Sequence, residues 1–456
     1  MYDMTSKSDI LMIAESCKGK TFAEIDNRNI LSETGNKGAL GHVIEMNAYE
    51  YDRNANPNKD FLIAGLELKV TPYRKNHDGT LSAKERLVLN MIDYFADYDK
   101  DIMDSSLMKK NSELLILFYL YQNGIDRANY TITHILDFQF PDEDFPVIRE
   151  DYNLIQTKIR RGEAHLISES DTMYLAACTK GANSLSTRKQ PFSSIVAKQR
   201  AYSLKTTYMT QIIRKRFTKK SFECLYITSE FQKTISFEEN IRRKVAKFYG
   251  KSQHELKNLF HISGNPKNLN EILFSRMLGL KGKVSKTDEF LKANIVPKTI
   301  RINESGRIKE SMSFPNFEFV EISVTDWEES DVRAYFDETK FLFIIFRYNV
   351  SGDLIFENVK LWNMPIDILD IEVRQVFDRT KEVINSGEIV SHVSKNGNLI
   401  NNFPGISFNG VCHIRPHGRN KKDVYQLPVA DKKTGLTSYT KQSFWLNNSY
   451  VISVIE

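Results

Sequence analysis

The order of apolar and polar residues along the chain predicts a mixture of helices and strands. Helical spacing predicts helices over residues 9–16 and 21–27, and a third, with two glycines, over residues 37–51. After a polar loop over residues 52–59 comes an apolar segment, Asp60–Pro72, which is interrupted by charges. The runs Leu114–Tyr121, Tyr130–Phe138 and Phe341–Phe346 are typical of buried strands, although the first also fits a buried helix. This mixture predicts an α/β or α+β layered fold.

Short motifs recur in the same order in the two halves of the chain. Residues 17–25 resemble 248–256, residues 63–71 resemble 292–300, residues 175–183 resemble 411–420, and residues 198–204 resemble 441–446. A shared order of weak matches indicates an internal duplication. We therefore expect two similar lobes, residues 1–220 and 238–456, joined by a connecting segment over residues 221–237.

Composition excludes several classes of protein. The chain has 456 residues, of which 41% are hydrophobic and 27% charged, as in soluble globular proteins. Its apolar runs are far shorter than the roughly 20 residues that cross a bilayer. Acidic residues interrupt the N-terminus, which does not resemble a signal peptide. Four scattered cysteines form no CxxC pair, so neither a disulfide framework nor a zinc knuckle is expected, and a reducing cytoplasm fits better.

Positive charge is concentrated in one stretch. The net charge is only +5, but residues 172–222 contain no acidic residue and eleven lysines or arginines. Such a field attracts polyanions, and interleaved Tyr202, Tyr208 and Phe217 favour a nucleic-acid surface over a merely solvated basic face.

Candidate chemistry lies in the segment that begins at Asp60. Asp60, Glu67 and Lys69 form the pattern D-x6-E-x-K. In a strand, Glu67 and Lys69 share a face, and Asp60 at its entry can turn toward them. Two carboxylates and the Leu68 carbonyl would offer oxygen ligands to Mg²⁺, beside which Lys69 could orient or deprotonate a water molecule. An isolated E-x-K pattern is more often a solvated salt bridge.

A second pattern upstream favours the catalytic interpretation. In K-G-x-x-G-x-x-x-E, Lys37, Gly41 and Glu45 follow each other at four-residue intervals and would share one stripe of a helix. The small glycines would allow close approach to another backbone, and Glu45 could supply a third carboxylate.

These residues resemble a known family. The sequences K-G-A-L-G-H-V-I-E over residues 37–45, D-F at 60–61 and G-L-E-L-K-V-T-P over 65–72 resemble the active-site region of the MutH family. That family has the PD-(D/E)xK nuclease fold and includes a mismatch-repair strand nickase and two-lobed restriction endonucleases that cut at GATC. The resemblance to the restriction branch covers most of the chain. It implies tandem MutH-like lobes, each a mixed central sheet flanked by helices.

The resemblance implies a role for each matched position. Asp60, Glu67 and Glu45 would be the acidic metal-site residues, with the Leu68 carbonyl as a further ligand, and Lys69 the catalytic lysine. Lys37 would support the site. In the sequence S-L-M-K-K over residues 106–110, Lys110 would reach the scissile phosphate, with Lys109 as the alternative.

The resemblance also implies a base-reading loop over residues 178–183. Side-chain and backbone groups there would enter the major groove. The nickase has Arg-Pro where this chain has Cys178 and Thr179, so Lys180 becomes the best donor to guanine. The expected DNA-contacting residues of the first lobe are Cys178, Thr179, Lys180, Gly181, Asn183, Lys198, Arg200 and Lys205.

The second lobe has lost its acids at the matched positions. Val296 replaces Glu67, approximately Leu278 replaces Glu45, and Glu289 stands for Asp60, while Lys298 remains. A lysine without its carboxylates cannot hold Mg²⁺, so this lobe should be catalytically inactive. Its reading loop retains the sequence I-R-P-H, and we expect DNA contacts from Arg415, Pro416, His417 and Arg419. His413 and His417 are four apart, but no further ligand pair accompanies them, so no metal site is expected.

The resemblance therefore implies a Mg²⁺-dependent type II restriction endonuclease that cuts duplex DNA before the G of 5′-GATC and leaves 5′ overhangs. One active lobe per chain implies dimerisation or looping on DNA, and such a system includes a cognate DNA methyltransferase. Two alternatives remain open: a mismatch-repair-type GATC nickase, which needs only one lobe, and a DNA-binding regulator without catalysis.

Overall fold

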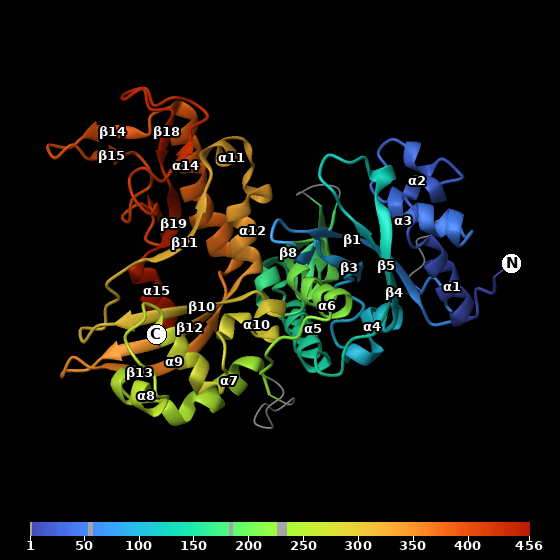
Figure 1. Ribbon diagram of the computed structural model, residues 1–456, viewed down its shortest axis with the longest axis horizontal. Coiled ribbons are helices and arrows are strands. Elements are labelled where there is room, and N and C mark those ends of the chain that lie inside the picture. Colours follow the sequence, from blue (N-terminus) through green and yellow to red (C-terminus); the bar gives the residue numbers. More distant parts are fainter. Residues whose placement is uncertain (1, 53–57, 182–185, 226–234) are drawn as a thin grey trace. The chain divides into compact units, whose positions relative to one another are not determined.

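The computed structural model describes residues 2–52, 58–181, 186–225 and 235–456 (Figure 1). The chain forms two compact units, residues 1–236 with 286–294 and residues 237–285 with 295–456. The segment Lys286–Asn294 therefore belongs to the first unit, although its place in the sequence predicts the second lobe. The expected division into two contiguous lobes is wrong for this segment.

A mixed sheet in the order β2-β1-β4-β5 organises the first unit. β1 (Glu67–Lys75) runs parallel to β4 (Leu114–Leu120), while β2 (Leu81–Ala83) and β5 (Thr131–Phe138) are antiparallel to their neighbours. A second sheet has the order β3-β9-β6, and β7 and β8 form a hairpin. These strands are β3 (Leu87–Met91), β6 (Leu175–Thr179), β7 (Thr187–Gln190), β8 (Ser193–Lys198) and β9 (Arg200–Leu204).

Helices cover these sheets. Figure 1 shows α1, α2 and α3 gathered beside the sheet that holds β1, β4 and β5. Ile10, Phe22 and Val43 from this side pack with Leu68 and Leu115 of the sheet in one apolar core. The helices of the unit are α1 (Lys7–Cys17), α2 (Phe22–Ile25), α3 (Ala39–Val43), a π-helix (Ile44–Ala48), α4 (Ser106–Asn111), α5 (Phe145–Arg160), α6 (Thr206–Thr218) and α10 (Asp288–Ala293).

The second unit repeats this plan. Its sheet β10-β12-β13 pairs β10 (Ile295–Ile302) parallel to β12 (Lys340–Tyr348) and β13 (Leu354–Trp362) antiparallel to β12. Its other sheet has the order β11-β19-β16, with β11 (Met312–Phe317), β16 (Cys412–Pro416) and β19 (Gln442–Leu446), and two hairpins join β14 (Val390–Val393) to β15 (Leu399–Asn401) and β17 (Val424–Gln426) to β18 (Ser438–Thr440). Its helices are α7 (Phe237–Val245), α8 (Gln253–Leu259), α9 (Leu269–Met277), α11 (Phe319–Val324), α12 (Asp331–Glu338), α13 (Ile366–Ile368), a π-helix (Leu369–Val373), α14 (Arg374–Ser386) and α15 (Asn448–Ile455).

The duplication seen in the sequence reappears in local structure. Thr21 and Ser252 each cap a short helix, and each side chain exchanges hydrogen bonds with a glutamate three residues later. Such a capping box satisfies backbone N–H groups that a helix start leaves unpaired. The parallel strands also match in register, because Glu67 lies opposite Leu114 and Val296 lies opposite Phe341.

Most predicted elements are present, with two differences near the candidate site. The first lies in the predicted helix 37–51, which begins only at Ala39 and widens into a π-helix at Ile44, so Lys37 precedes it. The second is that β1 begins at Glu67, because the chain from Asp60 to Leu66 forms a turn closed by two hydrogen bonds between Phe61 and Leu66. The run Leu114–Tyr121 is a strand and not a buried helix.

Candidate active site

Strand β1 places Glu67 and Lys69 on one face of the sheet. Glu67 is buried, and the Lys69 ammonium lies 2.8 Å from its Oε1 atom. Lys69 also donates to the Leu89 carbonyl of β3, at 3.2 Å. Because β4 pairs along β1, the strand cannot slip without turning both side chains to the opposite face. Their mutual position is therefore fixed by the sheet.

The turn before β1 brings Asp60 beside Glu67. The Leu68 N–H donates to Asp60 Oδ2 at 2.9 Å, and the Asp60 N–H donates to Glu67 Oε2 at 3.2 Å. Gly65 makes the turn possible, because its φ of +74° lies in the left-handed region that side chains disfavour. The two carboxylates thus meet at the entry of the strand, as the sequence predicts.

The closeness of the two carboxyl groups is electrostatically unfavourable. Burial raises the pKa of Asp60 to about 7, and the negative charge of Glu67 acts in the same direction. The Leu68 N–H, Lys69 and Lys110 act against this shift. Two acids held together in a buried place repel each other when both are ionised, and a bound cation would relieve that repulsion.

We expect the free energy of unfolding of the metal-free protein to fall as pH rises from about 4 to about 7, in the window set by the raised pKa of Asp60. The folded chain holds this proton more tightly than the unfolded chain, so the stabilisation is complete below the unfolded pKa and is lost as pH passes the folded one. Urea unfolding in a chelator measures the slope, which Asp60→Asn should flatten.

The exposed Asp78 provides the control for this slope. Hydrogen bonds from Thr80 lower the pKa of its carboxyl, so its contribution is present at neutral pH and is lost on acidification. Asp78→Asn should therefore change the pH dependence in the opposite sense. An unaltered slope in Asp60→Asn would contradict the burial of a strained carboxyl pair.

Helix α4 contributes a second lysine. Lys110 Nζ lies 3.5 Å from Glu67 Oε1 and donates to the Asn58 carbonyl at 3.1 Å, whereas Lys109 is exposed. Of the two lysines left open by the sequence, Lys110 is the one that the structure brings to the carboxylates. Lys59, which the sequence did not single out, donates to the Gly65 carbonyl and to Ser112 and so ties the turn to α4.

Glu45 and Lys37 occupy different surroundings. Glu45 lies in the π-helix, where its Oε1 atom is 4.0 Å from the position a Cβ would take at Gly41. Lys37 is exposed in the turn before α3 and does not share the helical stripe of Gly41 and Glu45. In the described part of the chain, no group of three or more His, Cys, Asp or Glu side chains surrounds a common metal position. The donors that fit a hard cation are thus the pair Asp60 and Glu67, which suits an ion that retains several waters.

Comparison with known proteins decides the family. A model described as the DNA mismatch repair enzyme MutH matches residues 49–151. The chain is also 34% identical over 477 residues to the type II restriction enzyme Sau3AI of Staphylococcus aureus, and the match covers 97% of each protein. The chain belongs to the MutH-like type II restriction enzymes. It is therefore a site-specific deoxyribonuclease, as the sequence predicts.

The region of this chain that matches the MutH model contains Asp60, Glu67, Lys69 and Lys110. Lys37 and Glu45 precede that region. The α/β fold class predicted from the sequence is also confirmed. Among the described residues, the helices are too short or too polar to cross a membrane.

The second unit lacks an acid at the matched strand. Val296 occupies the register position of Glu67, and Lys298 donates to the Ser313 carbonyl of β11 much as Lys69 donates to Leu89. Burial lowers the pKa of Lys298, which lies over the ring of Phe314. Glu289, expected to match Asp60, lies in α10 and accepts from the Leu225 N–H, and Leu278 follows the end of α9. With Val296 in place of a glutamate, Lys298 lacks the carboxylate partner that Lys69 has in Glu67.

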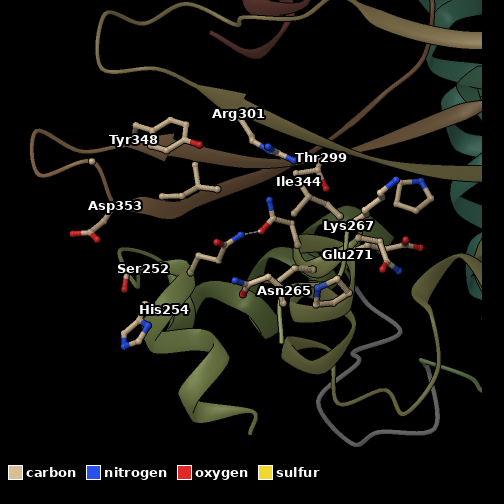
Figure 2. Close-up of a pocket in the computed structure, with 18 residues that line it drawn as sticks. Ser252, His254, Asn265, Lys267, Glu271, Thr299, Arg301, Ile344, Tyr348 and Asp353 are labelled. Atoms are coloured by element: carbon tan, nitrogen blue, oxygen red, sulfur yellow. Dashed lines mark hydrogen bonds between the residues drawn. The ribbon is translucent and has the colours of Figure 1, made fainter. Parts of the chain in front are cut away.

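Two pockets flank β10 in the second unit. One, of about 590 Å³, is lined by Lys298 together with Arg301, Arg307 and Lys309, and Glu310 is the acid in its lining. The other, of about 560 Å³, lies against Pro297, Thr299 and Arg301 and the starts of α8 and α9 (Figure 2). In that pocket, Gln253 and Asn270 are joined by a hydrogen bond. The cations beside Lys298 favour an anion, not a metal.

The expected reading loop of the first unit begins at the end of β6. Cys178 is buried within the strand, Thr179 is exposed at its end, and Lys180 and Gly181 are exposed after it. Asn183 lies outside the described residues. The exposed part of this loop is available to a DNA groove, but Cys178 is not.

Arg200 and Lys205 correct the predicted DNA surface. Arg200 is buried and donates to the carbonyls of Ala177 and Ile167, and Lys205 is buried and donates to the Thr172 carbonyl at 2.6 Å. Both side chains are held inside the protein by backbone carbonyl groups, so they cannot reach a DNA phosphate. Lys198, half-buried at the end of β8, remains at the edge of this surface.

The corresponding loop of the second unit is exposed at Arg415, Pro416, His417 and Arg419. The Arg415 guanidinium lies 4.9 Å from the ring centre of Trp445, which His417 meets edge-on. Stacking on an aromatic ring orients a guanidinium while leaving its donors available. His413 is buried against Asn447, so it does not form a metal pair with the exposed His417.

Proposed function

We propose that this enzyme hydrolyses both strands of duplex DNA before the G of 5′-GATC, in a Mg²⁺-dependent reaction that leaves 5′ overhangs. The observation that carries the proposal is the meeting of Asp60, Glu67, Lys69 and Lys110 in one cluster of a chain related to a type II restriction enzyme. The motifs shared with the GATC-cutting branch of the MutH family support the specificity.

The proposed chemistry assigns a task to each side chain. Asp60 and Glu67 would hold a magnesium ion, which acidifies water and stabilises charge on the phosphate. Lys69, held by Glu67 and the Leu89 carbonyl, would orient the attacking water. Lys110 would approach the scissile phosphate from α4 and stabilise the charge that develops there. Glu45 would be the third acidic metal-site residue and Lys37 would support the site, as the resemblance implies.

Digestion of unmethylated DNA of known sequence tests the proposal. With Mg²⁺ present, we expect fragments whose mapped ends begin with GATC at the 5′ terminus, and chelation should stop the reaction. Ends at other sequences would refute the specificity, and cleavage in a chelator would refute the metal requirement.

The match to a mismatch repair enzyme favours one second candidate, a strand nickase. The two functions differ in product. A nicked circle that never becomes linear would favour the nickase, whereas conversion of a circular plasmid to linear DNA favours the restriction enzyme.

We further propose that the second unit is a DNA-binding regulatory lobe. Its support is the exposed Arg415 on Trp445, together with the valine, Val296, at the position that Glu67 occupies in the first unit. Since one active lobe cuts one strand, two chains would meet on DNA by dimerisation or looping. A cognate DNA methyltransferase would protect the host.

Plasmids with one and with several GATC sites test this regulation. We expect faster cleavage of the plasmid with several sites, and stimulation of the single-site plasmid by added GATC duplex. Arg415→Ala should reduce that stimulation about tenfold, because a bidentate contact to guanine is worth about 1–3 kcal/mol. Arg347→Ala, which removes a partly exposed arginine paired with Glu357, is the control. Equal rates on both plasmids would refute a regulatory lobe.

A further inference from the structure

Tyr51 carries a hydroxyl group that the fold leaves without a partner. Its oxygen is buried, and no described residue forms a hydrogen bond with it. An unsatisfied buried hydroxyl is costly and therefore uncommon in native proteins. Such a group in a folded enzyme indicates that its hydrogen-bond partner is a molecule other than the protein itself.

The position of Tyr51 is fixed by the residues of the candidate active site. Its N–H donates to the Glu45 carbonyl at 3.1 Å, and its ring meets Phe61 edge-on, with ring centres 5.8 Å apart. Phe61 directly follows Asp60 and pairs with Leu66, which directly precedes Glu67. The side chain is thus held between the helix that carries Glu45 and the turn that carries the two other acids.

The charges around this hydroxyl are consistent with that position. Burial raises the pKa of Tyr51 well above its ordinary value, and the negative charges of Asp60, Glu45 and Glu67 raise it further. The group therefore stays protonated at neutral pH and acts as a hydrogen-bond donor. Three carboxylates lie within its electrostatic reach, although no hydrogen bond joins it to any of them.

We propose that Tyr51 is a positioning residue, whose hydroxyl donates a hydrogen bond to a water molecule held among Asp60, Glu67 and Glu45. The water completes the hydrogen bonding of the buried hydroxyl, and the hydroxyl orients the water for attack or for cation binding. This inference rests on the proposed Mg²⁺-dependent cleavage. It assigns to Tyr51 a role that the sequence patterns did not suggest.

Tyr49 provides a matched control two residues away. Its ring also meets Phe61 edge-on, with ring centres 4.9 Å apart, but its buried hydroxyl donates to the Ile10 carbonyl at 2.9 Å. Replacing either tyrosine by phenylalanine removes one oxygen and keeps the ring. The two variants therefore compare a hydroxyl that serves the fold with one that does not.

Tyr51→Phe should lower kcat about 10–100-fold and leave KM for DNA unchanged, as expected for the loss of a group that orients the ligands of a metal site. Mn²⁺ titration of the DNA-free protein, followed by electron paramagnetic resonance, should show about tenfold weaker binding. The midpoint of urea unfolding should stay or rise, because an unsatisfied buried group has been removed. Tyr49→Phe should do the reverse, with lower stability but wild-type kcat and Mn²⁺ affinity.

Wild-type kcat and Mn²⁺ affinity in Tyr51→Phe would overturn the proposal. So would a loss of activity accompanied by a loss of stability equal to that of Tyr49→Phe, since this would indicate a structural role. Failure of the underlying function is recognised separately, because the unaltered enzyme would then show no Mg²⁺-dependent cleavage at all.

Discussion

Replacing Glu67 by alanine should reduce Mg²⁺-dependent cleavage about a thousandfold or more, since metal and charge stabilisation of the transition state is worth several kcal/mol. Glu67 is the residue that Asp60, Lys69 and Lys110 all contact. Its loss removes one of two carboxylates for a cation and leaves Lys69 and Lys110 with their carbonyl partners, Leu89 and Asn58. Single-turnover cleavage of a GATC duplex with saturating enzyme measures the effect on chemistry alone.

Binding separates this expectation from simple unfolding. DNA affinity, measured with Ca²⁺ or without metal, should be retained or should increase, because a negative charge near the phosphates has been removed. The stability should also be preserved, since the repulsion on Asp60 is relieved. Glu113→Ala is the matched control, because Glu113 precedes the neighbouring strand β4 and pairs with the partly exposed Lys7. Unaltered cleavage in Glu67→Ala would show that the reaction occurs elsewhere.

The parts of this site that follow strand periodicity could be predicted from the sequence. Glu67 and Lys69 are two residues apart, and alternation in a strand places them on one face whatever surrounds them. The strand itself was recognisable by its apolar neighbours. The match between Leu114–Tyr121 and Phe341–Phe346 could likewise be inferred, because both runs consist of apolar and aromatic residues and are mostly buried.

Other features depend on contacts between distant segments, and periodicity has no information on these. The basic stretch 172–222 predicts a DNA surface from charge alone, yet Arg200 and Lys205 turn inward to backbone carbonyls. Tyr51 is conspicuous only once its hydroxyl is seen to lack a partner. A sequence shows which groups are available for hydrogen bonding, but not which of them the fold has already paired.

The start of the helix near residue 37 shows a further limit. Lys37, Gly41 and Glu45 have helical spacing, but Gly38 takes the capping position and the helix begins at Ala39. Glycine favours such ends over helix interiors. From Ile44 the helix widens to a π-helix, which changes the direction of Glu45 relative to a regular stripe. Helical spacing alone therefore wrongly placed Lys37 on one stripe with Gly41 and Glu45.

Replacing Lys292 by alanine should lower the free energy of unfolding of the first unit by about 3–5 kcal/mol, because it leaves buried charges without a partner. Lys292 is buried in α10, where its ammonium lies 2.7 Å from both Asp144 Oδ1 and Asp288 Oδ2. Tyr208 donates to the same Asp144 carboxylate at 3.0 Å, and Lys215 pairs with Asp288. Urea unfolding followed by circular dichroism measures the loss.

The partly exposed Lys7, which pairs with Asp137 and Glu113, calibrates this value. Lys7→Ala should cost about 1 kcal/mol or less, since solvent screens surface ion pairs. The comparison also tests the division of the chain, because a fragment that ends at residue 220 lacks α10 and leaves Asp144 without Lys292. Such a fragment should be less stable than the first unit within the full chain, by an amount comparable to the effect of Lys292→Ala. A fragment as stable as the full chain, together with a small effect of Lys292→Ala, would show that α10 is dispensable to the first unit.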